Sequence, residues 1–493
     1  MNKRLSIGII VTCLSSGMMV AAQNTLLADS VLVLNKEKAL TIALSENPTI
    51  KIADLEIKKK DYTKRESIAG LLPQIDAAAT YSRTLKKQQM YMSGGSFDMG
   101  SIMEAFLGPI YKELGIPMPD SGSSSFSSSE EGFEVGLDNT YSLGFTATLP
   151  IIAPQLWKSL DINEIDIQTS IEAARSSRLS LVNQVEKAYY NLMLCQDSYK
   201  VLQDQYNNAK LNAETYKNQY SQGTASEYDV LRAEVAVRNI EPSLLSAENA
   251  VRLVKLQLKV LLGIDNDINI VVDDSLSNYE KNMYNITMNI NHSLENNTDL
   301  RSLDLQTKML EKTVTLQKFA YIPTLAAQFN YNWISMTDGS PFKDFRWNPY
   351  STVALSLQIP IFSGGSRYYR VKQAQANVAQ MGFQRDNLER NLNMQLESQI
   401  DAIEKCVKQI GSNKLGVTQA EKAYTIMQKS FEIGSATFVT LNDAELALTS
   451  AKLSYNQAIY DFLAAVSDVN LLLGNTDLSQ YEKKGRQIIT DKI

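Results

Sequence analysis

Histidine is almost absent from this 493-residue chain, because His292 is the only one. A metal site built from several histidines is therefore excluded. A Ser/His/Asp triad would have to use His292, which makes such a triad improbable. Cysteine is also scarce, with Cys13, Cys195 and Cys406 as the whole set. Beyond the first residues no segment has the run of about 18 apolar residues that predicts a membrane-spanning helix. The sequence contains no P-loop and no cluster of metal-ligating residues, so we expect no enzyme activity and no cofactor.

The overall composition is that of a folded protein. Apolar residues make up 44% of the chain and charged residues 21%, which argues against global disorder. The formal net charge is −6, and this acidic balance argues against a nucleic-acid partner.

Residues 1–22 have the pattern of a secretory signal peptide. Two basic residues at positions 3 and 4 precede a mostly apolar run at 5–20, and small residues end at Ala22. We predict cleavage after Ala22 and export across the inner membrane. A membrane anchor is one alternative, although the run is interrupted by Ser and Gly and is short for a span. A lipoprotein signal at Cys13 is another alternative.

The chain contains an internal duplication. Gly434 follows Gly223 by 211 positions (434 − 223), in a similar local sequence. The same offset recurs along the chain in Cys195/Cys406, Ala233-Glu234/Ala444-Glu445 and Leu262-Gly263/Leu473-Gly474. A shared order at a constant offset indicates a repeat. Each copy is predicted to contain a helix, two strands joined by a loop, and two long helices joined by a tight turn.

These patterns divide the chain into segments, which we predict as follows: signal peptide at 1–22, first repeat at 23–263, equatorial connector at 264–284, second repeat at 285–474 and C-terminal tail at 475–493. The first repeat is predicted to hold strands near 73–83 and 137–150 and a helical hairpin at 155–262. The second is predicted to hold strands near 323–334 and 351–361 and a hairpin at 366–473. Residues 86–135 form a long loop between the first two strands.

The two predicted hairpins have the apolar seams of coiled coils. Apolar residues step by four and three over many heptads, for example at Leu181, Val185, Ala188, Leu192, Cys195, Tyr199, Leu202, Tyr206, Ala209, Ala213, Tyr216 and Tyr220. At about 1.5 Å per residue the longest helix would reach roughly 100 Å. Cys195 and Cys406 fall on such seams, so we interpret them as buried small residues, with a disulfide as the alternative. Pro242 is expected to bend its helix.

Apolar and polar residues alternate in each of the four predicted strands. In the fourth strand, Val353, Leu355 and Leu357 alternate with Ser356 and Gln358. Each segment has about 10 residues, the length with which a tilted strand crosses a bilayer. We expect Tyr81, Tyr141, Trp333 and Tyr350 to form an aromatic girdle near one end of the strands. An amphipathic sheet on a soluble core is the alternative. Four strands cannot close a barrel, so several copies would have to share one.

The sequence resembles the TolC-like outer-membrane efflux proteins over nearly its whole predicted mature length. The residues that carry the resemblance are Ala43-Leu44-Ser45-Glu46-Asn47-Pro48, Leu71-Leu72-Pro73, Ile322-Pro323-Thr324-Leu325, Ile359-Pro360-Ile361-Phe362-Ser363-Gly364-Gly365, and the two glycine-centred turns with the residues that follow them. The resemblance implies a mixed α and transmembrane β fold: a homotrimer with a 12-stranded β-barrel in outer-membrane lipid, continued by a coiled-coil α-helical barrel in the periplasm.

The same resemblance implies a function without catalysis. The protein is expected to be the outer-membrane exit duct of a tripartite efflux pump, conducting small molecules passively to the exterior. Its expected partners are a periplasmic adaptor and an inner-membrane pump, of the RND type or an ABC exporter. The outer-membrane component of a type I protein secretion system is the first alternative. A periplasmic coiled-coil adaptor is the second, although it would lack four strands of bilayer length.

The resemblance also implies which residues act at the helical tips. Adaptor docking is carried over to the two turns, at Gly223, Thr224, Ala225, Ser226, Gly434, Ser435, Ala436 and Thr437. The acidic rings of the family's gate fall on Asp443 and on Thr440, which is an uncharged departure. The family's Tyr and Arg latch positions fall on Phe431 and Ala436, so the usual latch contacts cannot form. We expect a gate that carries less charge and is less tightly latched.

Overall fold

The computed structural model describes residues 32–90, 111–113, 115, 133–280, 283, 293–339, 346–478 and 481. The predicted signal peptide, Cys13, His292 and most of the predicted external loop and tail lie outside these residues. The chain forms two compact units. The first unit contains Met1–Leu55, Glu172–Arg301 and Asn387–Ile493, and the second contains Glu56–Ile171 and Ser302–Asp386. None of the described helices is both long enough and apolar enough to cross a bilayer.

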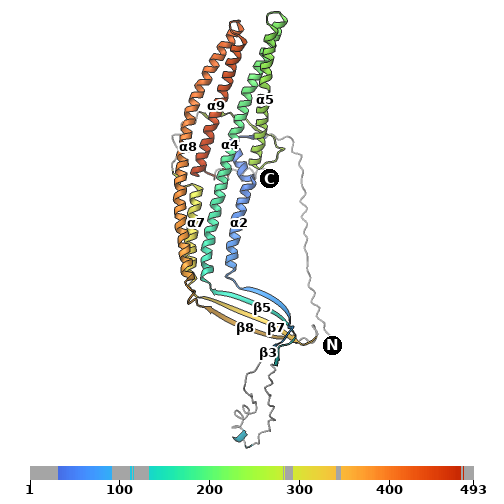
Figure 1. Cartoon of the computed structure of the whole chain (residues 1–493), viewed down its shortest axis with the longest axis vertical. Helices are drawn as coiled ribbons and strands as arrows, with labels where there is room; N and C mark the ends of the chain where they lie inside the picture. Colours follow the sequence, from blue (N-terminus) through green and yellow to red (C-terminus); the bar gives the residue numbers. More distant parts are fainter. Residues whose placement is uncertain are drawn as a thin grey trace. The chain divides into compact units, whose positions relative to one another are not determined.

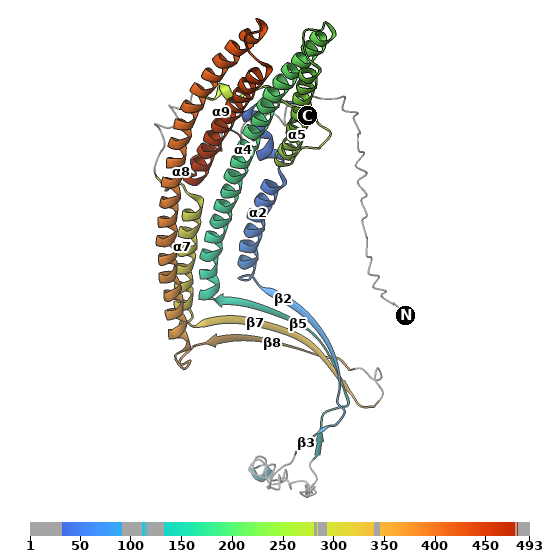
Figure 2. The same cartoon turned by 45° about the horizontal axis from the view of Figure 1, so that its top comes forward.

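The second unit is built on one antiparallel sheet. Its strands are β2 (Gln74–Arg83), β5 (Asn139–Ile152), β7 (Thr324–Thr337) and β8 (Asn348–Gln358), in that spatial order. They lie side by side in one curved layer (Figures 1 and 2). Within the described residues, β2 pairs only with β5 and β8 only with β7. Each outer strand therefore keeps one edge of backbone N–H and C=O groups available for another strand.

The register of the sheet collects residues of one kind into rows. Ile75 pairs with Ala147, Ala147 with Phe329, and Phe329 with Val353, so this row across all four strands is apolar. The neighbouring row, Asp76, Thr146, Asn330 and Thr352, is polar and lies on the opposite face. Thr146 Oγ1 donates to Asn330 Oδ1 at 2.9 Å in this row. The alternation in the separate strands thus becomes one apolar face and one polar face.

Three of the four residues expected in an aromatic girdle share one face of the sheet, and Tyr350 lies on the other. Tyr81 pairs with Tyr141, and their rings stack with centroids 4.8 Å apart. Trp333 lies on the same face of the sheet, two residues along β7 from the partner of Tyr141. Tyr350 pairs with Asn332 and therefore faces the other side. The alternation of β8 assigns its apolar face to odd-numbered residues, and an even-numbered position cannot share that face.

Proline positions explain where two strands differ from the predicted bounds. β8 ends at Gln358, although strand structure was predicted to 361. Pro360 has no N–H for a ladder bond, and it restricts the residue before it. β5 continues past Pro150 to Ile152, where the register with β7 shifts in a bulge. A bulge is where a sheet tolerates proline, so this strand is longer than predicted.

Charged side chains tie the strand ends together at the end of the sheet remote from the helices. Lys87 Nζ lies 3.2 Å from Asp138 Oδ1 and 3.0 Å from Asp338 Oδ1. The backbone N–H of Gly339 donates to Asp138 Oδ2 at 3.1 Å. Next to this cluster the short strands β3 (Gln88–Met90) and β4 (Phe133–Val135) pair and extend the β2–β5 hairpin. The base of the predicted external loop is therefore well anchored.

Two helical hairpins of nearly equal length dominate the chain. α4 (Pro154–Ser221) and α5 (Glu227–Leu262) have 68 and 36 residues, and α8 (Ser366–Glu432) and α9 (Phe438–Leu473) have 67 and 36. The shorter helices α2 (Pro48–Ala69) and α7 (Thr298–Phe319) both have 22 residues. Pro242 lies inside α5, which continues through it without interruption. The corresponding helices of the two sequence repeats therefore have nearly the same lengths.

In the first unit, each repeat has a buried asparagine that joins the end of its second long helix to a shorter helix. This contact is called the joint of the repeat below. Asn47 follows α1 (Lys36–Glu46) and donates from Nδ2 to the carbonyl of Leu261 in α5 at 2.8 Å. Asn297 precedes α7 and donates to the carbonyl of Leu472 in α9 at 2.7 Å. Both asparagines are buried, at 5% and 3% exposure. The amide thus satisfies a carbonyl at the C-terminal end of a helix, which would otherwise lack a partner.

The main core of the first unit surrounds the middle of the hairpins. The predicted seam residues Leu181, Val185 and Leu192 are buried there, whereas Tyr220, assigned to the same seam, is 49% exposed. The predicted connector contributes β6 (Ile270–Val272), which pairs in parallel with β1 (Leu32–Leu34), and buries Leu276. Cys195 and Cys406 are free thiols, half-buried and buried respectively.

Candidate functional site

The first turn, between α4 and α5, is defined by backbone geometry. Gly223 has a φ of +75°, a conformation that non-glycine residues rarely adopt. Its N–H donates to the carbonyl of Tyr220 at 2.9 Å, and the N–H of Thr224 donates to that of Gln219 at 2.9 Å. Ser226 caps α5 and forms a capping box with Asp229. The chain reverses direction here, and the turn satisfies several backbone groups at the ends of the two helices.

The second turn, between α8 and α9, repeats this geometry. Gly434 has a φ of +77°, and its N–H donates to the carbonyl of Phe431 at 3.0 Å. The N–H of Ser435 donates to the carbonyl of Ser430 at 2.8 Å. Thr437 caps α9 by accepting from the N–H of Thr440. The predicted docking residues of both turns are exposed except the half-buried Ala225 and Ala436.

A small aromatic core joins the two hairpins immediately inside the turns. The Tyr216 ring of α4 lies 5.5 Å from Phe438 of α9 and 5.8 Å from Phe431 of α8, measured between centroids. Ala233 of α5 is fully buried in the same cluster, and Ala225 packs against it. Phe431 occupies a predicted latch position, whereas no role was predicted for Phe438. The signal was present, since Phe438 directly follows a capping residue and starts an apolar seam.

The four predicted gate residues lie close to this cluster but do not contact one another through polar groups. Asp443 is exposed, and within the described residues its carboxylate forms no hydrogen bond or ion pair. The Thr440 hydroxyl donates to the carbonyl of Thr437 at 2.8 Å, so it serves the helix start. Phe431 contacts Tyr216 through its ring, and Ala436 offers no polar group.

One buried carboxylate near the predicted gate residues has no signal in the sequence. Glu445 of α9 is 5% exposed, and its Oε1 has no hydrogen-bond partner within the described residues. Burial raises the pKa of Glu445, and a hydrogen bond from Asn208 of α4 partly opposes this. Asn208 also donates to the hydroxyl of Tyr424 in α8 at 3.4 Å. Three helices thus enclose one carboxyl group, and no ion pair to a described residue stabilises its charge.

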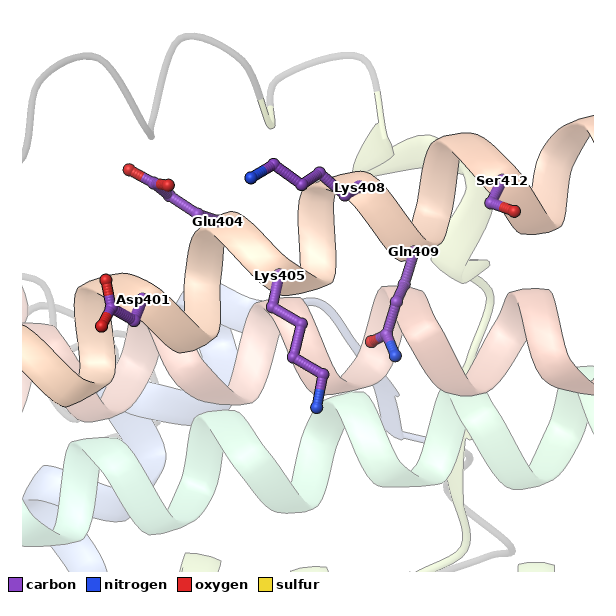
Figure 3. A pocket seen from close by; sticks show the side chains of 6 residues that line it. All are labelled: Asp401, Glu404, Lys405, Lys408, Gln409 and Ser412. Carbon is purple, nitrogen blue, oxygen red and sulfur yellow. The ribbon is translucent and has the colours of Figure 1, made fainter.

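One open hollow in the described part of the chain lies on α8 and has no features of a ligand site. Six side chains of this one helix line about 570 Å³ of open space: Asp401, Glu404, Lys405, Lys408, Gln409 and Ser412. Figure 3 shows that Lys405 and Gln409 point to one side of the helix and Glu404 and Lys408 to the other. Within the described residues no group of three or more metal-ligating side chains occurs.

Comparison with known proteins identifies the family to which this duplicated frame belongs. The family of outer membrane efflux proteins matches residues 118–264 and 289–475 in two segments. The chain belongs to the outer membrane efflux protein family. Membership places the protein in the outer membrane, with a long helical extension in the periplasm.

Individual relatives are distant in sequence. The chain is 19% identical to the outer membrane protein TolC of Vibrio cholerae serotype O1, over 64% of this chain and 73% of that one. It is 21% identical to the alkaline protease secretion protein AprF of Pseudomonas aeruginosa, over 64% and 65%. The Campylobacter jejuni CmeC outer membrane channel has the same fold, with a TM-score of 0.64 and 16% identity over 91% of this chain and 89% of that channel.

Proposed function

We propose that three copies of this chain form a passive exit duct through the outer membrane. The observation that carries the proposal is the open sheet: β2 and β8 each lack a partner on one side within the described residues. Open edges are not tolerated in lipid, so copies must pair edge to edge. Two copies would give eight strands and a filled interior, whereas three give twelve and room for water. The polar row of Thr146, Asn330 and Thr352 then lines the pore.

In this proposal the helices continue the barrel as a periplasmic tube whose turns bind the adaptor of an inner-membrane pump. The shared geometry of the turns at Gly223 and Gly434 supports one docking mode for both. The first candidate function is efflux of small molecules, driven by a pump of the RND type or an ABC exporter. In this function the chain itself catalyses no reaction. Protein export in a type I system is the second candidate, favoured by the likeness to the secretion protein AprF.

The assembly is tested on the full-length protein purified from outer membranes. Light scattering in detergent should give the mass of three chains. Electrophoresis in dodecyl sulfate should show a band that runs as a trimer until the sample is boiled. A protein that stays soluble and monomeric without detergent would overturn the proposal.

The gate is tested by conductance. Three Asp443 carboxylates around one axis would attract cations, so Asp443→Asn should weaken the block of single-channel current by divalent or trivalent cations at least several-fold. The matched control is Glu248→Gln, which removes an exposed carboxylate in the middle of α5 and should leave the block unchanged. Equal block in both variants would remove Asp443 from the gate.

A further inference from the structure

The passage from β8 to α8 differs from the corresponding passage of the first repeat in its charges. No Asp or Glu occurs between Asp344 and Asp386, but Arg367, Arg370 and Lys372 lie within that stretch. In the first repeat the start of α4 contains acids as well as Lys158, whose Nζ lies 3.1 Å from Asp161 Oδ2. The second passage, at 359–372, therefore contains three cations and no acid of its own.

Around the start of α4, cations of α2 and α4 form ion pairs with its acids, whereas the three cations of the second passage form none within the described residues. Lys60 of α2 pairs with Asp166 of α4 at 2.9 Å, and Lys64 pairs with Glu164. Within the described residues Arg367, Arg370 and Lys372 form no ion pair. Arg367 donates instead to the carbonyl of Pro360 at 3.1 Å. Lys372 lies over the ring of Tyr368, with Nζ 5.7 Å from its centroid.

Large apolar and aromatic side chains are exposed beside these cations. The exposed fractions are 91% for Ile361, 86% for Phe362, 55% for Tyr368 and 64% for Tyr369. Amphipathic rings next to Lys and Arg are typical of the depth at which acyl chains meet headgroups. The passage directly follows β8, and the helices extend into the periplasm. If β8 crosses the membrane as proposed above, these residues emerge at its periplasmic surface.

We propose that this surface, residues 361–372, binds the headgroups of acidic phospholipids in the periplasmic leaflet of the outer membrane. The exposed side chains of Ile361 and Phe362 enter the acyl region, and Arg370 and Lys372 contact the phosphodiester and its net negative charge. Charge complementarity favours an acidic lipid, because a zwitterionic headgroup would not neutralise the unpaired cations. The first passage, with its ion pairs, has no such preference. This inference rests on the proposed membrane position of β8.

The test uses full-length protein in detergent and native mass spectrometry, with phosphatidylglycerol and phosphatidylcholine titrated in parallel. The wild-type protein should retain phosphatidylglycerol at least threefold more often than phosphatidylcholine. Arg370→Gln combined with Lys372→Gln should bring this ratio close to one, and the hydrogen bond of Arg367 stays in place. Lys60→Gln combined with Lys158→Gln removes the same charge from the ion pairs around the start of α4 and should leave the ratio unchanged.

Three outcomes would overturn the inference: no preference in the wild-type protein, an unchanged ratio in the Arg370/Lys372 variant, or an equal fall in both double variants. If the Arg370/Lys372 variant instead loses its oligomeric state while the remaining oligomers keep the lipid ratio, the surface is an interface between copies. Failure of the proposed function looks different. In that case the wild-type protein would not insert into vesicles of phosphatidylcholine alone, whereas failure of the lipid inference leaves insertion intact.

Discussion

The two helical hairpins share their backbone and differ in the side chains near the turns. Helix lengths, glycine conformations and turn hydrogen bonds match between α4–α5 and α8–α9. At the offset of 211, however, Asp229 corresponds to Thr440, and Arg232 to Asp443. Glu234 is exposed on α5, while its counterpart Glu445 is buried on α9. A duplicated frame thus conserves the turn, and the residues just beyond it distinguish the second hairpin, where the predicted gate lies.

The largest expected effect is the loss of stability when glycines at equivalent positions of the two repeats are replaced by alanine. Gly474 ends α9 with a φ of +64°, and a Cβ there would lie 2.1 Å from the carbonyl oxygen of Asn296. Gly434 has a similar φ but open space around it. Gly474→Ala should lower the free energy of unfolding by about 2–5 kcal/mol, through backbone strain and overpacking. Gly434→Ala should cost about 1–2 kcal/mol, through strain alone.

Urea unfolding followed by circular dichroism measures both glycine variants. Gly263→Ala is a further comparison, because its Cβ would lie 2.9 Å from the carbonyl of Glu46 in the equivalent joint of the first repeat. The loss of unfolding free energy in Gly263→Ala should fall between those of Gly474→Ala and Gly434→Ala. Equal losses at Gly474 and Gly434 would mean that the joint relaxes and does not constrain the repeat.

The second-largest expected effect is the pH dependence of stability that comes from Glu445, compared with its equivalent Glu234. Burial raises the pKa of Glu445 above the ordinary value of 4.5, so the folded protein binds this proton more tightly than the unfolded chain does. The resulting stability is fully present below pH 4.5 and is lost as the pH rises through the raised value. Glu445→Gln cannot ionise. It should remove this pH dependence and raise the free energy of unfolding at pH 7 by roughly 1–3 kcal/mol.

Glu234→Gln is the matched control for this comparison, because Glu234 is exposed at the equivalent position. It should change the stability at neither pH. Urea midpoints of both variants and the wild-type protein at pH 5 and pH 8 give the answer. A wild-type stability that rises between these values, with the same rise in Glu234→Gln and none in Glu445→Gln, would show that Glu445 is more stable ionised.

The smallest expected effect concerns the helix starts. Ser226 and Asp229 form a reciprocal capping box on α5, whereas Thr437 caps α9 without an acidic partner. Ser226→Ala and Thr437→Ala should each cost about 1 kcal/mol of local stability, with the larger loss at Ser226. Hydrogen exchange of the first-turn amides of α5 and α9 measures this. A larger increase in exchange at α9 of Thr437→Ala than at α5 of Ser226→Ala would contradict this ranking.

Sequence pattern could predict those features that depend on neighbours along the chain. Alternation in β2 and β8 places Ile75 and Val353 on one face, and the register of the sheet aligns them. Tyr350 shows the limit, since proximity in sequence to a strand end does not specify a face. Ser226 and Thr437 could be read as caps because a capping bond spans only three residues. The buried state of Glu445 could not, because its equivalent Glu234 also follows an alanine on an amphipathic helix and is exposed.

The sequence by itself determined the duplication, the long helices, the alternating strands and the glycine turns, because each depends on periodicity or on the conformation of single residues. Only the tertiary structure decided which residues from distant segments meet. The bond from Asn47 to Leu261, the rings of Tyr216 and Phe438, and the enclosure of Glu445 by three helices all require contacts across many residues. Such contacts follow from how whole faces pack, and that packing is not encoded in any local pattern.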